Sequence, residues 1–360
     1  MRIMFSIVLG LHVLIHFLGP LKSFHPQLVP QLSRNISRTE GIFWFLDGIL
    51  LLLALLFLIY KKELWPFLAI AGVLLSQILI SLNWSDAKYG TFLNLLILAV
   101  SVPAIARGSF QKMVSSEVAV LRNEANITPV SKMQKIEELP EVVQKWLKSS
   151  GAAEYANIRT VYLEQQGKMR TTPEGRWMDF TAVQNFSVQK PGFVWYAEVS
   201  AYPGISLSGR DKLRNSHGEM LIKAASIIPV VDEKGNEKID SGSLLRYLGE
   251  ICWFPSAARA NFIEWTAAGQ NSAVAEITSR GLKVKGTFYF SPDGTLLSFE
   301  TLRFYGAAKN SRPEKWHIEI LENQNFDGIL VPSKCRVTWK LAEGDFTWLE
   351  LEVNSLKYNP

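Results

Sequence analysis

Residues 41–60 read GIFWFLDGILLLLALLFLIY, and this stretch decides the architecture of the chain. A helix needs about 20 mostly apolar residues to cross a bilayer. The fourteen Leu, Ile and Phe residues together favour insertion by about −7 kcal/mol, whereas the single Asp47 opposes it by about +3 kcal/mol. The stretch therefore predicts a membrane-spanning helix that carries one carboxylate.

Three further apolar stretches, residues 3–18, 64–82 and 90–106, complete a set of four. The first contains two histidines and is followed by Gly-Pro-Leu-Lys instead of a small-residue cleavage site, so we expect a retained helix and not a signal peptide. Short polar connections between the stretches predict an antiparallel four-helix transmembrane bundle. In architecture alone, this layout resembles the DoxX-like four-helix membrane proteins.

Polar residues in the four predicted helices share one depth. His16, Asp47, Gln77 and Asn94 all lie about 5 to 9 Å below the same membrane face at a rise of 1.5 Å per residue, and His12 lies one turn deeper. Two interpretations stay open: hydrogen bonds that hold the bundle together, or a site for a ligand or a proton. Histidines four residues apart can chelate a metal, but the helices hold no further His or Cys. We expect no metal and no cofactor.

The positive charges around the helices favour a cytoplasmic location for both chain ends. The face that carries the N-terminus has five Lys and Arg residues and the other face has four, which under the positive-inside rule favours the first face as cytoplasmic. We expect a multi-pass protein of the bacterial inner membrane with a cytoplasmic C-terminal domain. The two sets are Arg2, Lys61, Lys62, Arg107 and Lys112, against Lys22, Arg34, Arg38 and Lys88.

Composition divides the chain at Arg107–Gly108, where an almost uncharged part meets an ordinary mixture of polar and apolar residues. We expect a transmembrane domain over residues 1–107, an amphipathic segment and linker over 108–138, and a soluble domain over 139–360. The net charge of +5 comes from Lys and Arg interleaved with Asp and Glu, which does not favour nucleic acid as a partner. Cys252 and Cys335 have no CxxC partner, and we expect two buried thiols.

The C-terminal domain shows the two-residue period of β-strands, for example over residues 177–186 and 193–199. Turn sequences such as Pro292-Asp293-Gly294 separate the strands. No helix of ten residues interrupts the pattern after Gly269, which predicts an antiparallel sheet. Ten or more such strands predict curvature into a half-barrel or a barrel. The amphipathic residues 112–124 are expected along the membrane surface or the bundle.

One predicted helix, residues 241–255, interrupts the strands, with a serine cap before it and a proline after it. Its apolar face suits the concave side of a curved sheet. Arg246 and Glu250 are one turn apart on another face, so they form either a helix-stabilising pair or a contact with Arg210 or Asp211.

This helix carries a resemblance to a known family. The motif Gly242-x-Leu244-x-Arg246-Tyr247-Leu248-x-Glu250-x-x-Trp253-Phe254-Pro255 resembles that of a bacterial, membrane-associated family of unknown function. The resemblance covers roughly residues 139–321 and implies a bacterial origin and a fold, but no activity. The curved sheet closed by a helix is also similar to the half-barrel shape of lipoprotein carriers.

No GxSxG, P-loop, GxGxxG or HExxH motif occurs, so the leading hypothesis is not enzymatic. The sheet domain is expected to bind an apolar or lipid-like molecule beside the bilayer. The alternatives are a small-molecule enzyme that uses Arg210, Asp211, Arg246 and Glu250, or a membrane sensor or scaffold. Besides these four polar residues, the predicted ligand-binding residues are Trp177, Phe180, Phe186, Phe193, Trp195, Trp253 and Phe254.

Overall fold

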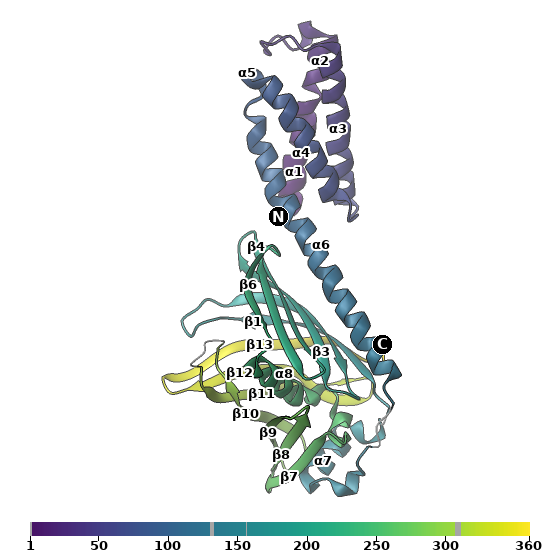
Figure 1. The fold of residues 1–360 in the computed structure, drawn as a ribbon, viewed down its shortest axis with the longest axis vertical. Coiled ribbons are helices and arrows are strands. Elements are labelled where there is room, and N and C mark those ends of the chain that lie inside the picture. The colour runs from purple at the N-terminus through teal and green to yellow at the C-terminus, as the bar shows by residue number, and fades with distance from the viewer. Residues whose placement is uncertain (1, 130–132, 156, 307–310) are drawn as a thin grey trace. The chain divides into compact units, whose positions relative to one another are not determined.

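The chain forms two compact units, Met1–Gln111 and Lys112–Pro360. Helices build the first, which we call the helical unit, and a curved antiparallel sheet builds the second, the sheet unit (Figure 1). The structure is a computed structural model that describes residues 2–129, 133–155, 157–306 and 311–360.

The helical unit consists of α1 (Arg2–His16), α2 (Leu18–Phe24), the short turn η1 (Pro26–Leu28), α3 (Arg38–Ile59), α4 (Trp65–Leu82), α5 (Trp84–Ala87) and the first part of α6 (Gly90–Ile127). Four helical stretches in the described part of the chain are long and apolar enough to cross a membrane. They are Arg2–Phe24, Arg38–Ile59, Trp65–Leu82 and Gly90–Ile127.

The helix α3 begins at a capping box. The Ser37 hydroxyl accepts a hydrogen bond from the Glu40 amide (3.2 Å), and the Glu40 carboxylate accepts one from the Ser37 amide (2.9 Å). Further along, α3 and α4 approach closely at Gly72, where a Cβ atom would lie 2.5 Å from Leu51. The lack of a side chain at this position lets the two backbones come together.

The helix α6 differs from the prediction. It is one unbroken helix, Gly90–Ile127, across the composition shift at Arg107–Gly108. Residues 112–127 contact the sheet: Glu117 pairs with Arg210 (3.2 Å) and Lys212 (2.9 Å). A single glycine costs a helix only about 1 kcal/mol, which the contacts of this segment offset.

We expect the ion pair between Glu124 and Arg214 to make the packing of α6 on the sheet sensitive to pH. Hydrogen bonds from the Arg214 guanidinium, such as Nε to Oε2 at 3.1 Å, hold the pKa of Glu124 below its usual value. A carboxyl group with a lowered folded-state pKa stabilises the fold above its unfolded pKa of about 4.3 and loses this effect as the pH falls through the folded value.

We therefore expect the amide protection of residues 112–127 to fall below about pH 4, as measured by hydrogen exchange. The Glu124→Gln variant should not show this pH-dependent fall in protection. Amide protection elsewhere in the sheet unit serves as the control. A wild-type segment whose protection follows the rest of the sheet at every pH would contradict this account.

The sheet unit holds one sheet of thirteen strands among the described residues. The strands are β1 (Thr160–Met169), β2 (Met178–Ser187), β3 (Gly192–Tyr202), β4 (Ile205–Arg214), β5 (His217–Ala224), β6 (Ile228–Lys234), β7 (Ile263–Gly269), β8 (Ser272–Ser279), β9 (Leu282–Phe290), β10 (Leu296–Phe304), β11 (Pro313–Phe326), β12 (Ile329–Leu341) and β13 (Gly344–Tyr358). All pairings are antiparallel. Helix α7 (Glu141–Ser149) precedes them, with the short turns η2 (Ile136–Glu138) and η3 (Ala152–Glu154) beside it.

The sheet is open, which corrects the expectation of a possible barrel. Its strand order is β6-β5-β4-β3-β2-β1-β13-β12-β11-β10-β9-β8-β7, so β6 and β7 are its two edges in the described part of the chain. Helix α8 (Glu237–Glu250) lies inside the curve (Figure 1). Because this helix fills the concave face, the two edges need not meet to bury the core.

Helix α8 begins four residues before the predicted start. Asn236, and not a serine, is the N-cap: its side-chain oxygen accepts a hydrogen bond from the Ile239 amide at 3.0 Å. The short turns η4 (Ile251–Trp253) and η5 (Pro255–Arg259) follow the helix. Gly249 faces β10, where a Cβ atom would lie 2.9 Å from the Phe299 ring, so this face of α8 lies close against the sheet.

Candidate functional site

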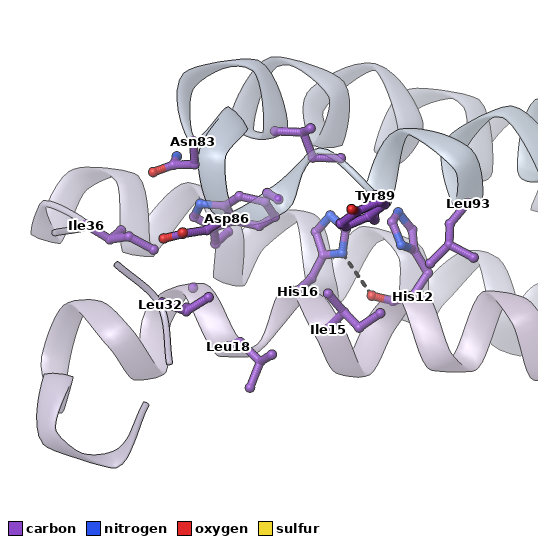
Figure 2. A pocket seen from close by; sticks show the side chains of 15 residues that line it. His12, Ile15, His16, Leu18, Leu32, Ile36, Asn83, Asp86, Tyr89 and Leu93 are labelled. Carbon is purple, nitrogen blue, oxygen red and sulfur yellow. Dashed lines mark hydrogen bonds between the residues drawn. The ribbon is translucent and has the colours of Figure 1, made fainter. Parts of the chain in front are cut away.

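A pocket of about 230 Å³ opens among the helices of the helical unit. Apolar side chains such as Ile15, Leu18, Ile36 and Leu93 form most of its wall (Figure 2). The polar side chains that reach it are His12, His16, Trp44, Asn83, Asp86 and Tyr89. A mostly apolar wall with a few convergent polar groups is typical of a small-molecule site.

A buried acid–base pair lies beside this pocket. His16 Nε2 on α1 is 3.0 Å from Asp47 Oδ2 on α3, and the two side chains are 1% and 0% exposed. His16 Nδ1 lies 2.9 Å from the carbonyl oxygen of His12 (Figure 2), which accepts a hydrogen bond when Nδ1 carries a proton. The His16 ring thus lies between the His12 carbonyl and the Asp47 carboxylate. Asp47 does not line the pocket; it positions His16, which does.

Amide side chains extend the polar cluster to α4 and α6. His12 Nε2 lies 2.8 Å from Asn94 Oδ1, and the Asn94 amide donates to Gln77 Oε1 at 3.0 Å. The Gln77 amide in turn donates to the Thr91 hydroxyl at 3.1 Å. The His12 and His16 rings meet edge to face, with centroids 4.4 Å apart. The structure thus brings together all five residues of the predicted membrane cluster.

Besides His16 Nε2, whose contact is the Asp47 carboxylate, three polar atoms of the pocket residues have no hydrogen-bond partner among the described residues. They are His12 Nδ1, Trp44 Nε1 and Asn83 Oδ1, and all three are buried. Leaving a buried donor or acceptor unsatisfied costs about 1–3 kcal/mol. Unmet groups of this kind in a pocket wall suit a bound molecule that carries hydrogen-bonding groups.

The connection between α2 and α3 forms one wall of the pocket, through Leu32 and Ile36. Asp86 holds this connection: its carboxylate accepts hydrogen bonds from the Ser33 hydroxyl (2.6 Å) and the Arg34 amide (2.8 Å). The Ser33 bond, more than any other interaction, lowers the pKa of Asp86 from its usual value. Lys22 donates to the Leu32 carbonyl at 2.7 Å. The hydrogen bonds of Asp86 and Lys22 therefore hold this wall in place.

A second polar cluster lies on the concave face of the sheet unit. Arg246 on α8 donates to Asp211 Oδ2 (2.6 Å) and to Glu250 Oε1 (2.8 Å). The Gln184 amide donates to the other Glu250 oxygen at 2.8 Å. The Arg246 guanidinium also lies 5.0 Å from the Trp195 ring. These contacts fix α8 to β2 and β4, although Asp211 Oδ1 has no hydrogen-bond partner among the described residues.

The predicted set of four polar residues does not assemble. Neighbouring residues of a strand face opposite sides of a sheet, so the side chains of Arg210 and Asp211 point to opposite faces. Asp211 faces α8, whereas Arg210 pairs with Glu117 (3.2 Å) and Glu219 (3.2 Å) on the other face. Asp211, Arg246 and Glu250 form one group, and Arg210 lies outside it. The alternative of an enzyme that uses all four residues therefore lacks Arg210.

The predicted aromatic residues mostly form the core of the sheet unit. Phe186, Phe193 and Phe254 are fully buried, and Phe180 and Trp253 are 3% exposed each. The Phe186 ring contacts four others, at centroid distances of 6.2, 6.5, 6.3 and 4.8 Å. Trp195 is half-buried and Trp177 is 37% exposed. Ligand binding by this set stays a prediction, because α8 occupies the face where the ligand was expected.

Comparison with protein families matches residues 129–351 to the family of unknown function DUF6544. The chain belongs to this family. The DUF6544 match contains the motif around Arg246 and agrees with the resemblance found in the sequence. It leaves the helical unit and its pocket outside the matched region.

Solved structures similar to this DUF6544 member share little of its sequence. A DUF1329 family protein from Desulfovibrio piger is 12% identical, over 61% of this chain and 92% of its own, with a TM-score of 0.35. A putative outer membrane lipoprotein-sorting protein domain from Vibrio parahaemolyticus is 9% identical, over 62% and 94%, with a TM-score of 0.37. A LolA superfamily protein from Nitrosomonas europaea is 9% identical, over 61% and 94%, with a TM-score of 0.36. A search of curated proteins finds no match.

Sequence reasoning missed several residues of the pocket. Trp44 lies three residues before Asp47 on the same helix face, and its ring is 5.0 Å from that of His16. Ser76, which does not line the pocket but joins the polar cluster, precedes Gln77 and lies 3.4 Å from His12 Nε2. Helical spacing could have revealed Trp44. The residues from the α2–α3 connection leave no such signal, because only the tertiary fold brings them to the pocket.

Proposed function

We propose that this protein is an integral protein of the bacterial inner membrane and binds a small, mostly apolar molecule with a hydrogen-bonding head between its helices. The helices Arg2–Phe24, Arg38–Ile59, Trp65–Leu82 and Gly90–Ile127 have the length and hydropathy for this location. The surplus of Lys and Arg on the face with the N-terminus favours a cytoplasmic sheet unit. The bilayer is the source of the ligand.

The observation that carries the proposal is the buried His16–Asp47 pair at the wall of the pocket. Ionisable residues inside membrane helices are costly and commonly mark functional sites. His12 Nδ1 and Trp44 Nε1 add two unmet polar atoms to the same wall. The rest of the wall is apolar. The wall therefore fits a ligand that has a polar head and a hydrocarbon or ring body.

The pocket limits the size of this ligand. Its 230 Å³ is below the range of about 300–1,000 Å³ found for drug-sized ligands. A compact molecule, or the head and first part of a longer lipid-like one, fits. Helix α8 packs on the sheet face where we expected the ligand from the sequence, so we place the ligand in the helical unit.

Photo-crosslinking tests this placement. A diazirine-bearing residue at position 93, whose leucine lines the pocket, is compared with the same residue at position 95, whose leucine is 59% exposed. Position 93 should give one dominant small-molecule adduct in cell membranes, and position 95 a mixture of bulk lipids. Identical adducts at both positions would refute a specific pocket ligand.

A further inference from the structure

The hydrogen bonds of the polar cluster in the helical unit run in one direction and fix which nitrogen of His12 carries a proton. The Asn94 amide group donates to Gln77 Oε1 at 3.0 Å, and the Gln77 amide group donates to the Thr91 hydroxyl at 3.1 Å. The Asn94 Oδ1 atom is therefore an acceptor, and it lies 2.8 Å from His12 Nε2. The single proton of a neutral His12 ring is then on Nε2.

The other nitrogen of this ring, Nδ1, is left as an acceptor that lacks a donor. It is buried and has no hydrogen-bond partner in the part of the chain that the structure describes. The Ser76 hydroxyl contacts the same Nε2 atom as Asn94, at 3.4 Å, and adds nothing to Nδ1. Because His12 lines the pocket (Figure 2), a bound molecule can supply the donor that Nδ1 lacks.

Two further residues of the pocket wall limit what the bound molecule must offer. The Asn83 amide group donates to the Leu79 carbonyl oxygen at 3.1 Å, so the Asn83 Oδ1 atom, which has no partner among the described residues, is a second free acceptor. Trp44 Nε1, unpartnered in the same sense, can only donate. Tyr89 sets no preference, because it is 79% exposed and a hydroxyl serves either role. The wall thus needs both donors and an acceptor from its ligand.

Few head groups meet both needs. A hydroxyl donates and accepts, whereas an ether, an ester or a quinone carbonyl has no hydrogen to give to His12 Nδ1. An ammonium group has no lone pair for Trp44 Nε1. Of the described residues that line the pocket, none is Lys or Arg and one is Asp86, which disfavours an anionic head. A neutral hydroxyl therefore fits the wall best.

We propose that the ligand of the helical pocket is a neutral alcohol or phenol whose hydroxyl group donates to His12 Nδ1 and which has an oxygen for Trp44 Nε1. This inference rests on the proposed function, because it names the chemical class of the ligand in the same pocket. Asn94 acts on the ligand only through His12. By accepting the proton of Nε2, it keeps Nδ1 free to accept, and it is a positioning residue that sets the specificity.

The test compares two probes that share one ring system: naphthol, which can donate a hydrogen bond, and its methyl ether, which cannot. Both are compact, as a pocket of about 230 Å³ requires. The full chain in phosphatidylcholine nanodiscs is equilibrated with each probe at the same concentration in the bilayer, and native mass spectrometry measures the bound fraction. Naphthol should bind at least about tenfold more tightly, because the ether leaves His12 Nδ1 without a donor.

Variants separate this hydrogen bond from a general loss of structure. Asn94→Leu removes the acceptor that holds the proton on Nε2 and should lose most of the preference for naphthol, and His12→Phe should lose all of it. Leu95→Ala, at a position 59% exposed on the same helix as Asn94, should keep it. Equal binding of both probes by wild type, or an unchanged ratio in Asn94→Leu, would overturn the inference while the pocket ligand would stand. Absence of naphthol binding, or binding that Leu93→Trp does not reduce, would refute the ligand pocket itself.

Discussion

Replacing Asp47 with leucine is expected to lower ligand occupancy of the helical pocket by about tenfold, because leaving the buried His16 Nε2 atom without its partner costs about 1–3 kcal/mol. Without the carboxylate, the His16 ring loses the acceptor that lies 3.0 Å from its Nε2 atom. Native mass spectrometry of the full chain measures the bound fraction. Insertion of α3 into the membrane should not be impaired, because leucine favours a membrane helix more than aspartate does.

Two further variants give this prediction its controls. Asp47→Asn keeps an acceptor oxygen and should lose less occupancy than Asp47→Leu. The double variant with His16→Leu should be no worse than either single change, because both residues act through one contact. Independent, additive losses would contradict the role of Asp47 as a positioning residue.

Replacing Arg246 with leucine is expected to destabilise the sheet unit by about 3–5 kcal/mol, because it leaves buried carboxylates without their partner. Asp211 and Glu250 are 2% and 6% exposed, and Arg246 donates to both. Urea unfolding of the full chain, followed by circular dichroism of the strands, measures the change. Replacing all three charges with apolar residues of similar volume should recover most of the loss.

The pH dependence of the Arg246→Leu variant adds a signature. Burial raises the pKa of Glu250 above its usual value, so ionisation of this group opposes folding as the pH rises above the unfolded pKa of about 4.3. The cost of Arg246→Leu should therefore be larger at neutral pH than near pH 4. The control Arg336→Leu removes the ion pairs with Glu319 and Glu350. Because this arginine is 40% exposed, the change should cost only about 1 kcal/mol or less. Equal costs for Arg246 and Arg336 would contradict the structural role of the cluster.

Local periodicity predicted the helices and the curved antiparallel sheet, because the periods of 3.6 and 2 follow from backbone geometry. The residues at which helices begin and end were harder to predict from the sequence. The composition shift at Arg107–Gly108 changes the surroundings of α6 without ending it. The Asn236 cap lies in a polar segment before the apolar pattern of α8 begins. Whether the sheet closes into a barrel depends on how α8 packs on its concave face. The sequence of a single strand does not contain this information.

The candidate site shows the same division. Antiparallel helices with polar residues at matching distances from their ends place His16 and Asn94 at one depth, and the structure joins them through His12. The period of two also holds the information that Arg210 and Asp211 face opposite sides, although the sequence interpretation grouped them. The pocket itself needs the α2–α3 connection to fold back, and long-range packing of this kind leaves no periodic pattern.

The most direct test of the central claim is native mass spectrometry of the full chain released from membrane particles with its lipids. Wild type should retain one small apolar molecule, Leu93→Trp should lose it by filling the pocket, and Leu95→Trp, at a position 59% exposed on the same helix, should keep it. A wild-type chain without a retained molecule, or equal retention in both tryptophan variants, would contradict ligand binding in the helical pocket.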